Sequence, residues 1–291
     1  MPREIALLTN PSAGKGRASR VVEPALQRLR DAGLVVRNLR GRSPEEAADL
    51  ARQCVEEGLE SLVVIGGDGI VHLALQALVG SGTRLGVLPA GTGNDVARSL
   101  GIPRDDPAAA VDLVISGRSR RIDVARVGHR CFVTVLAAGF DAVVSERANQ
   151  MRWPRGQMRY QLATLAALRV FEPIPYVMDL DGVEHRFDAM LVAVGNGPSF
   201  GGGLRITEGA VLDDGLLDVV VIGAMRKREL VVTYPRLFSG THVTHPAYRH
   251  YSGRRITLAA PGITAYADGE RIAPLPLTVE VAPAALEVLV P

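Results

Sequence analysis

The first half of the chain alternates short apolar runs with longer amphipathic stretches. Strands are predicted for four apolar runs, at 5–8, 34–38, 62–65 and 85–88. Helices are predicted for the stretches between and after them, at 18–31, 44–57, 70–80 and 95–100. Strands that alternate with helices pair in parallel, with helices on both faces of the sheet. The pattern therefore predicts an N-terminal α/β domain with a parallel sheet, over about 1–124.

The pattern changes after about residue 124. Short apolar runs separated by Gly, Pro and Asp are typical of an antiparallel β-sandwich, here at 132–136, 176–180, 189–194, 217–222, 256–260 and 277–281. One helix is predicted among them, at 158–171. The chain is thus expected to have a second, β-sandwich domain over 125–285.

Composition adds few constraints. A chain of 291 residues with 47% apolar residues can bury one or two cores. Its net charge of +2 gives no basic field, so nucleic acid is not an expected partner. Cys54 and Cys131 lie in apolar stretches without metal-ligand spacing, which favours buried free thiols in a cytoplasmic protein. No signal peptide or membrane-spanning run is recognisable.

The segment Gly66-Gly67-Asp68-Gly69 joins a predicted buried strand to a predicted helix. Glycines in such a turn let a phosphate approach backbone N–H groups at the start of the helix. A carboxylate in the same turn repels a bare anion, and a bridging Mg²⁺ resolves that conflict. The alternative is an ordinary tight turn with Asp68 as a cap.

Three more loops follow predicted strands: 10–16 (Asn-Pro-Ser-Ala-Gly-Lys-Gly), 89–95 (Pro-Ala-Gly-Thr-Gly-Asn-Asp) and 268–270 (Asp-Gly-Glu). With 194–197, 200–203 and 212–217, these segments resemble the diacylglycerol kinase catalytic domain of soluble bacterial lipid kinases. That family shares its nucleotide-binding fold with sphingosine kinases and NAD kinases. The resemblance covers nearly the whole chain, and it implies that 286–291 rejoins the first domain.

The resemblance implies an ATP site and Mg²⁺ as cofactor. Nucleotide contacts carried over residue by residue are Asn10, Pro11, Ser12, Ala13, Gly14, Lys15, Gly66, Gly67, Asp68, Gly69, Ile70, Val71, His72, Thr92 and Asn94. Lys15 is one of two lysines in an arginine-rich chain. It would supply a compact charge near the phosphates, or it is a solvated loop lysine.

Two groups of acidic residues are implied to act through Mg²⁺. Asp95 and Asp123 resemble the carboxylates that join Asp68 in a network around water and metal, although Asp95 alone reads equally well as a helix N-cap. Asp214, with the carbonyls of Val211 and Leu216, resembles a structural Mg²⁺ site. Without the resemblance, the Asp-Asp-Gly around Asp214 is an ordinary turn.

The catalytic base is expected in Asp268-Gly269-Glu270. A lipid alcohol must lose its proton as it attacks phosphorus, and a carboxylate can accept that proton. The family implies Glu270 as the acceptor, supported by Asp268. Taken alone, the same tripeptide favours a plain hairpin turn.

The chain departs from the common bacterial pattern after Gly69. Ile70, His72 and Leu73 replace a Thr and an Asn-Glu pair and look more like sphingosine and ceramide kinases. His72 is expected on the helix surface rather than in catalysis. In addition, 40–42 reads Arg-Gly-Arg where the family has a nucleotide-binding Thr.

The resulting hypothesis is an ATP-dependent kinase of a lipid hydroxyl, with diacylglycerol as first choice. Alternatives are a kinase of a sphingoid base, prenol or phosphatidylglycerol-like lipid, an NAD kinase, and a nucleotide-binding regulator without catalysis. The lipid would be reached at the membrane surface by a cytoplasmic, peripherally associated protein. Segment 147–160, with four arginines and one Trp, is the expected contact, a solvated loop being the alternative. The sequence leaves the formation of a homodimer undecided.

Overall fold

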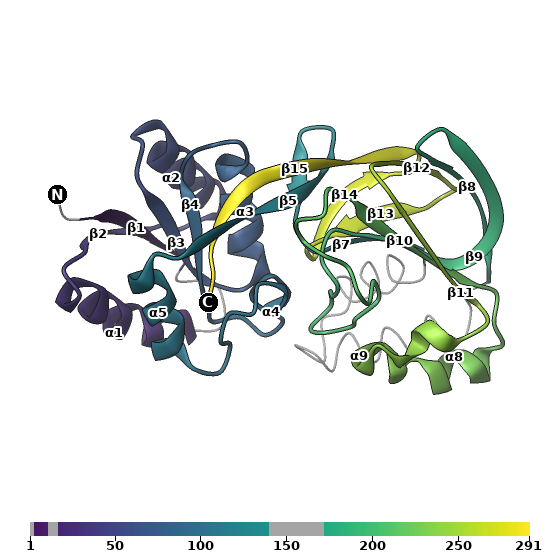
Figure 1. The fold of residues 1–291 in the computed structure, drawn as a ribbon, viewed down its shortest axis with the longest axis horizontal. Helices are drawn as coiled ribbons and strands as arrows, with labels where there is room; N and C mark the ends of the chain where they lie inside the picture. The colour runs from purple at the N-terminus through teal and green to yellow at the C-terminus, as the bar shows by residue number, and fades with distance from the viewer. Residues whose placement is uncertain (1–2, 11–16, 140–171) are drawn as a thin grey trace.

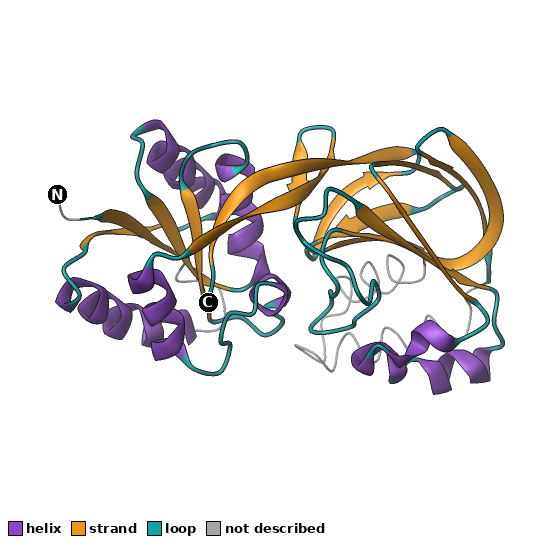
Figure 2. Ribbon diagram, in the orientation of Figure 1, coloured by secondary structure: helices purple, strands orange, loops and turns teal. Residues whose placement is uncertain are grey.

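The computed structural model describes residues 3–10, 17–139 and 172–291. In its first domain, helices cover both faces of a parallel sheet in the order β4-β3-β1-β2 (Figures 1 and 2). This confirms the predicted α/β architecture. The elements are β1 (Glu4–Thr9), α1 (Arg17–Asp31), β2 (Val35–Arg40), α2 (Pro44–Glu56), β3 (Ser61–Gly66), α3 (Asp68–Leu78), β4 (Arg84–Pro89), α4 (Asp95–Ser99) and α5 (Pro107–Ser116).

The second domain is antiparallel and rich in strands, as predicted. Strands follow one another in the order β14-β13-β7-β9-β8-β12-β15, and β10 pairs with β9 and β11. Their bounds are β5 (Ser119–Val127), β6 (Arg130–Phe132), β7 (Val135–Gly139), β8 (Ile174–Leu180), β9 (Val183–Gly195), β10 (Leu217–Gly223), β11 (Tyr248–Gly253), β12 (Arg255–Ala259), β13 (Thr264–Ala267), β14 (Glu270–Pro274) and β15 (Leu277–Leu289). Three short helices lie between β10 and β11: α8 (Lys227–Thr233), α9 (Arg236–Ser239) and η2 (Thr241–Thr244).

Two long strands join the domains. β15 runs antiparallel to β5, from Glu280 opposite Arg126 to Leu289 opposite Ser119. Its end also pairs in parallel with β4, through Val288 and Leu85. The last strand therefore starts in the second domain and ends in the core of the first, and it crosses between the two lobes in Figure 1.

The predicted strand over 132–136 is wrong as a single element. It is split into β6 and β7, because the N–H groups of Val133 and Thr134 donate to the carboxylate of Asp268. A hydrogen bond to a side chain takes the place of ladder pairing at this point.

Two further expectations concern the thiols and the helix at 158–171. Both cysteines are buried free thiols, as predicted. The predicted helix 158–171 lies outside the described residues.

Candidate active site

The two glycine turns of the first domain meet at the carboxyl ends of β3 and β4. The N–H of Ala90 donates to the carbonyl of Gly66 at 2.8 Å. A methyl group on Gly91 would lie 2.4 Å from the Cα of Gly67, so only glycine permits this approach. No side chain caps the start of α3. Its first N–H groups and its dipole are therefore available to a phosphate.

Asp68 and Asp95 face each other across Gly93. A methyl group on Gly93 would lie 2.9 Å from Oδ2 of Asp68 and 3.5 Å from Oδ2 of Asp95. Burial, with smaller contributions from Asp95 and Asp268, raises the pKa of Asp68 to about 6. The N–H of Val96 donates to Asp68 at 3.1 Å and partly offsets that rise. Such a carboxylate pair is poised for a cation.

Asp95 is not the helix N-cap, which was one of its expected roles. Asn94 occupies that position in a left-handed conformation, with φ of 53°. The Asn94 side chain bonds both backbone groups of Gly91, at 3.0 and 3.1 Å, and so holds the loop. The carboxylate of Asp95 instead accepts from the N–H of Gly202 at 2.6 Å.

The contact between Asp95 and Gly202 ties the two domains together at the site. Gly202 belongs to a run of three glycines, 201–203, all with positive φ. Gly203 lies against the guanidinium of Arg98, since a methyl group there would be 3.0 Å from Cζ. The sequence showed this glycine motif but not its role, because its partner lies about 100 positions away.

Asp268 is buried and almost surrounded by donors. Its carboxylate accepts from the N–H groups of Val133 and Thr134, at 3.2 and 3.1 Å, and from the Thr134 hydroxyl. Nδ1 of His72 lies 3.3 Å from its Oδ2. Nothing in the local sequence pointed to Val133 and Thr134. With its oxygens engaged in this way, Asp268 is suited to fixing the turn.

The prediction that His72 lies on the helix surface is wrong. The residue is 6% exposed, because the second domain packs its Asp268 turn over α3. Gln76, one turn along, bonds both backbone groups of Cys131, at 2.9 and 3.0 Å. His72 and Gln76 together attach α3 to the second domain.

Glu270 stands in contrast to Asp268. It is exposed at the start of β14, and its Oε1 lies 4.0 Å from the position that a methyl group on Gly69 would take. Gly69 follows Asp68 in the first turn of α3. The carboxylate of Glu270 therefore reaches toward the glycine turn at the start of α3 from the opposite domain.

A polar cavity of about 860 Å³, including its open mouth, lies at the end of β4. Its lining includes Thr92 and Asn94, with Arg20, Arg104 and Asp105. Asn10 is buried at the end of β1. The other expected contacts of that loop, Pro11, Ser12, Ala13, Gly14 and Lys15, lie outside the described residues, as does segment 147–160.

The third acid that was expected to join Asp68 and Asp95 is Asp123. Its two carboxylate oxygens accept from the N–H groups of Gly215 and Ala284, at 2.6 and 2.7 Å. It thereby holds the turn that carries Asp214. The Asp214 carboxylate accepts from the N–H of Leu216 at 3.0 Å and is exposed. Within the described residues, no three acidic, His or Cys side chains converge as metal ligands.

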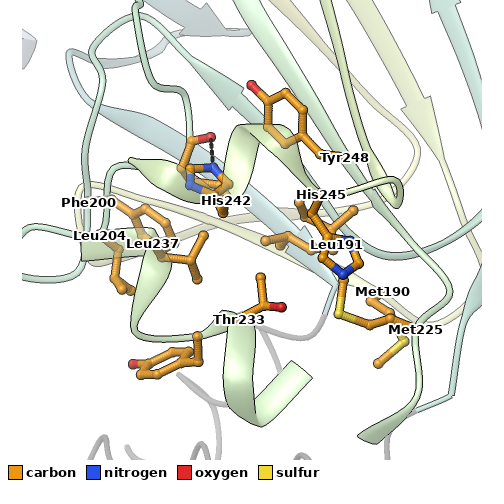
Figure 3. A pocket seen from close by; sticks show the side chains of 13 residues that line it. Met190, Leu191, Phe200, Leu204, Met225, Thr233, Leu237, His242, His245 and Tyr248 are labelled. Carbon is orange, nitrogen blue, oxygen red and sulfur yellow. Dashed lines mark hydrogen bonds between the residues drawn. The ribbon is translucent and has the colours of Figure 1, made fainter. Parts of the chain in front are cut away.

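A second cavity lies inside the C-terminal domain, between the sheet and the helices α8, α9 and η2 (Figure 3). It measures about 750 Å³ with its mouth, and its lining is mostly apolar, including Leu191, Phe200, Leu204, Leu237 and Tyr248. Burial lowers the pKa of His242, which faces it and whose Nε2–H donates to the Ile206 carbonyl at 3.2 Å. Phe200 and Leu204 flank the glycine run that contacts Asp95, so this cavity adjoins the acidic pair.

Comparison with known proteins settles the family. Residues 4–127 match the diacylglycerol kinase catalytic domain, and residues 134–290 match the YegS C-terminal NAD kinase beta sandwich-like domain. A diacylglycerol kinase of Mycobacterium tuberculosis is 40% identical in an alignment of 294 residues that covers 99% of this chain and 95% of that one. The chain belongs to the bacterial diacylglycerol kinase family.

Other members of this family are similar over most of their length. A diacylglycerol kinase of Bacillus subtilis is 26% identical over 81% of this chain and 79% of its own. A putative diacylglycerol kinase from Bacillus anthracis has the same fold, with a TM-score of 0.82 at 22% identity, covering 99% of this chain and 95% of that one. The family membership confirms the resemblance seen in the sequence.

Proposed function

We propose that the protein transfers the γ-phosphoryl group of ATP to the hydroxyl of diacylglycerol. The observation that carries the proposal is the position of Glu270, whose carboxylate approaches the first turn of α3 beside Gly69. A base from one domain is thereby brought to the phosphate turn of the other. The named activity of the 40% identical relative points to the same reaction.

The proposed step has a simple balance. The lipid hydroxyl oxygen forms a bond to the γ-phosphorus, and the bond from that phosphorus to the β,γ-bridging oxygen breaks, releasing ADP. Glu270 accepts the hydroxyl proton. Asp268, fixed by four donor groups, holds the turn that presents Glu270. This division of roles follows from exposure: Glu270 is accessible, and Asp268 is buried.

The nucleotide would lie along the carboxyl ends of β3 and β4. Backbone N–H groups at the start of α3 suit its phosphates, and the cavity with Thr92, Arg20 and Arg104 suits the rest of the molecule. Ligands of such sheets bind at this edge. Ile70, Val71 and His72 are buried in α3, so their contribution would be through the helix backbone and its packing.

Mg²⁺ fits the acidic pair. Asp68 and Asp95 approach one point beside Gly93, and burial, with a smaller contribution from Asp95, raises the pKa of Asp68. Mg²⁺ commonly takes one or two carboxylates together with substrate phosphates, which agrees with a site of only two facing acids. When bound, the metal supplies charge neutralisation for the transferring phosphate.

A second Mg²⁺ is proposed at the 211–216 turn, held by Asp214 and the carbonyls of Val211 and Leu216. The exposed Asp214 carboxylate accepts from the N–H of Leu216, within this turn. Its role would be structural, because the turn is anchored by Asp123 at the junction of β5 and β15.

The apolar cavity favours a lipid as acceptor over NAD. A cavity lined by Leu, Met, Phe and Tyr side chains suits an acyl chain, and it adjoins the loop that contacts Asp95. A nicotinamide dinucleotide would instead need polar partners there. A nucleotide-binding regulator without catalysis would not need the carboxylate of Glu270 beside the first turn of α3.

The test is a competition among acceptors. The purified protein is incubated with γ-labelled ATP, Mg²⁺ and equimolar diacylglycerol, sphingosine, a prenol, phosphatidylglycerol and NAD, and the labelled products are identified. The proposal expects phosphatidic acid as the main product. Label on any other acceptor, with diacylglycerol unmodified, would overturn the choice of substrate.

A further inference from the structure

The segment Met225–His245, here called the helical cap, has two faces of different character. It contains α8, α9 and η2 and closes the apolar cavity from outside. Its inward residues Met225, Thr233, Leu237 and His242 line that cavity (Figure 3). The outward face is not accounted for by the fold or by the proposed reaction.

Exposed apolar side chains concentrate on this outward face. Among the described residues, seven large apolar side chains are exposed. Four of the seven belong to the helical cap: Val231, Val232, Phe238 and Val243, exposed by 51%, 72%, 44% and 37%. Isolated exposed apolar residues are ordinary, whereas a cluster within 13 positions indicates an interaction surface.

The same segment is basic. It contains Arg226, Lys227, Arg228 and Arg236 against a single acid, Glu229. Glu229 is itself engaged, because it accepts from the N–H of Arg226 at 2.9 Å and so caps α8. Apolar residues flanked by unbalanced arginines complement an anionic lipid surface, where the cations meet headgroups and the apolar side chains enter the acyl boundary.

We infer that the outward face of the helical cap docks on an anionic bilayer. Docking there would place the apolar cavity directly beneath the bilayer surface, with the helical cap between lipid and cavity. The docking itself does not depend on the chemistry; its use in delivering an acyl chain rests on the proposed function. The segment predicted from sequence for membrane contact, 147–160, is a different part of the chain.

Vesicle sedimentation tests the docking. Wild-type protein is mixed at low salt with vesicles of phosphatidylcholine alone or of phosphatidylcholine and phosphatidylglycerol at three to one. We expect sedimentation with the anionic vesicles and a marked loss in concentrated salt. The double variant Val232→Ser/Phe238→Ser should bind at least about tenfold more weakly. Changing Arg226 and Arg228 to Gln should weaken binding about 25-fold, roughly fivefold for each arginine.

Matched controls use exposed residues elsewhere. Val35→Ser/Val183→Ser removes apolar side chains that are 45% and 59% exposed, on β2 and β9. Arg52→Gln/Arg121→Gln removes two exposed arginines outside the helical cap. Both controls should sediment like the wild type. If they lose binding as much as the helical-cap variants, or if those variants bind normally, the inference is wrong.

Two further readouts separate the alternatives. Phosphorylation of a dispersed short-chain diacylglycerol should be unchanged in the helical-cap variants, since none of the altered residues lines the cavity. If the wild type lacks kinase activity but sediments as described, the docking stands and the proposed function fails. If ultracentrifugation shows a dimer that Val232→Ser/Phe238→Ser dissociates, the face is covered by a second copy and the membrane assignment is overturned.

Discussion

At the scale of single residues, the site separates three acids with different tasks. Asp268 is buried among four donors, and Glu270 is exposed beside the glycine turn at the start of α3. Asp68 is buried and has the carboxylate of Asp95 as a neighbour. Each arrangement determines what the carboxylate can do. The assignment of the proton acceptor follows from this difference in surroundings.

Exchanging each acid of the hairpin for its amide distinguishes their roles. Glu270→Gln keeps the shape and removes the basic oxygen, so kcat should fall by roughly 10²–10⁴ while ATP affinity and melting temperature stay unchanged. Asp268→Asn turns an accepting oxygen into a donor that faces the N–H of Val133 or Thr134. It should lower the free energy of unfolding by about 1–3 kcal/mol.

Steady-state kinetics, nucleotide binding and denaturant unfolding of both variants provide the measurement. A normal melting temperature for Asp268→Asn together with the larger loss of kcat would transfer the role of base to Asp268.

Asp68 should destabilise the protein at neutral pH in the absence of ligand. Its pKa is about 6 in the folded state and 3.8 in the reference state, so the folded protein binds more protons between those values. Stability is thus lost as the pH rises through this window. Asp68→Asn should raise the free energy of unfolding at pH 7.5 by up to about 3 kcal/mol, and the gain should shrink toward pH 4.

The same substitution should abolish phosphoryl transfer, because the Asn side chain cannot balance Mg²⁺. Urea unfolding across this pH range checks the stability claim. A variant less stable than wild type at pH 7.5 would show that the carboxylate is already neutralised by its neighbours.

At the scale of elements, the site depends on two glycine turns packed against each other. Gly91→Ala would place a methyl group 2.4 Å from the Cα of Gly67. We expect a cost of about 1–3 kcal/mol in stability and weaker ATP binding, as the turns must separate. Gly82→Ala is the matched control, since no atom lies within 4 Å of its methyl position and no positive φ applies. Equal melting temperatures for the two variants would contradict the close approach.

The sequence was most informative where local signals decide the structure. Apolar periodicity located β1 to β4 and α1 to α4. The helix α5 was missed, although its signals are local: Asp106 caps it, Pro107 begins it and Gly117 ends it in a left-handed conformation.

The remaining misses are tertiary. The burial of His72, the break between β6 and β7, and the bond from Gly202 to Asp95 all arise where the second domain contacts the first. Their partners are distant in sequence, so neither periodicity nor turn chemistry contains them. The acids of the site could be named from motifs, whereas their hydrogen-bonding states could not.

At the scale of the whole molecule, one continuous sheet links the two domains. In the part of the chain that the structure describes, β5 and β15 form the connection, and Asp123 fixes the Asp214 turn next to it. No helix among the described residues is long and apolar enough to cross a bilayer.

A metal at the Asp214 turn should stabilise this junction. Mg²⁺ that binds only the folded state raises the melting temperature by mass action. We expect millimolar Mg²⁺ to raise the melting temperature of the wild type more than that of Asp214→Ala. The ATP affinity of this variant should stay near normal. Asp213→Ala, the adjacent exposed acid, is the control. An identical Mg²⁺ response in Asp214→Ala and wild type would exclude a metal at this turn.

The central claim is transfer of phosphate from ATP to diacylglycerol by a base on the second domain. Its most direct measurement follows γ-labelled phosphate from ATP into lipid, with ADP counted alongside, for wild type and Glu270→Gln. The account predicts one labelled phosphatidic acid per ADP in the wild type, and a rate lower by roughly 10²–10⁴ in the variant with equal ATP binding. ADP formation without labelled lipid, or an unimpaired variant, would contradict it.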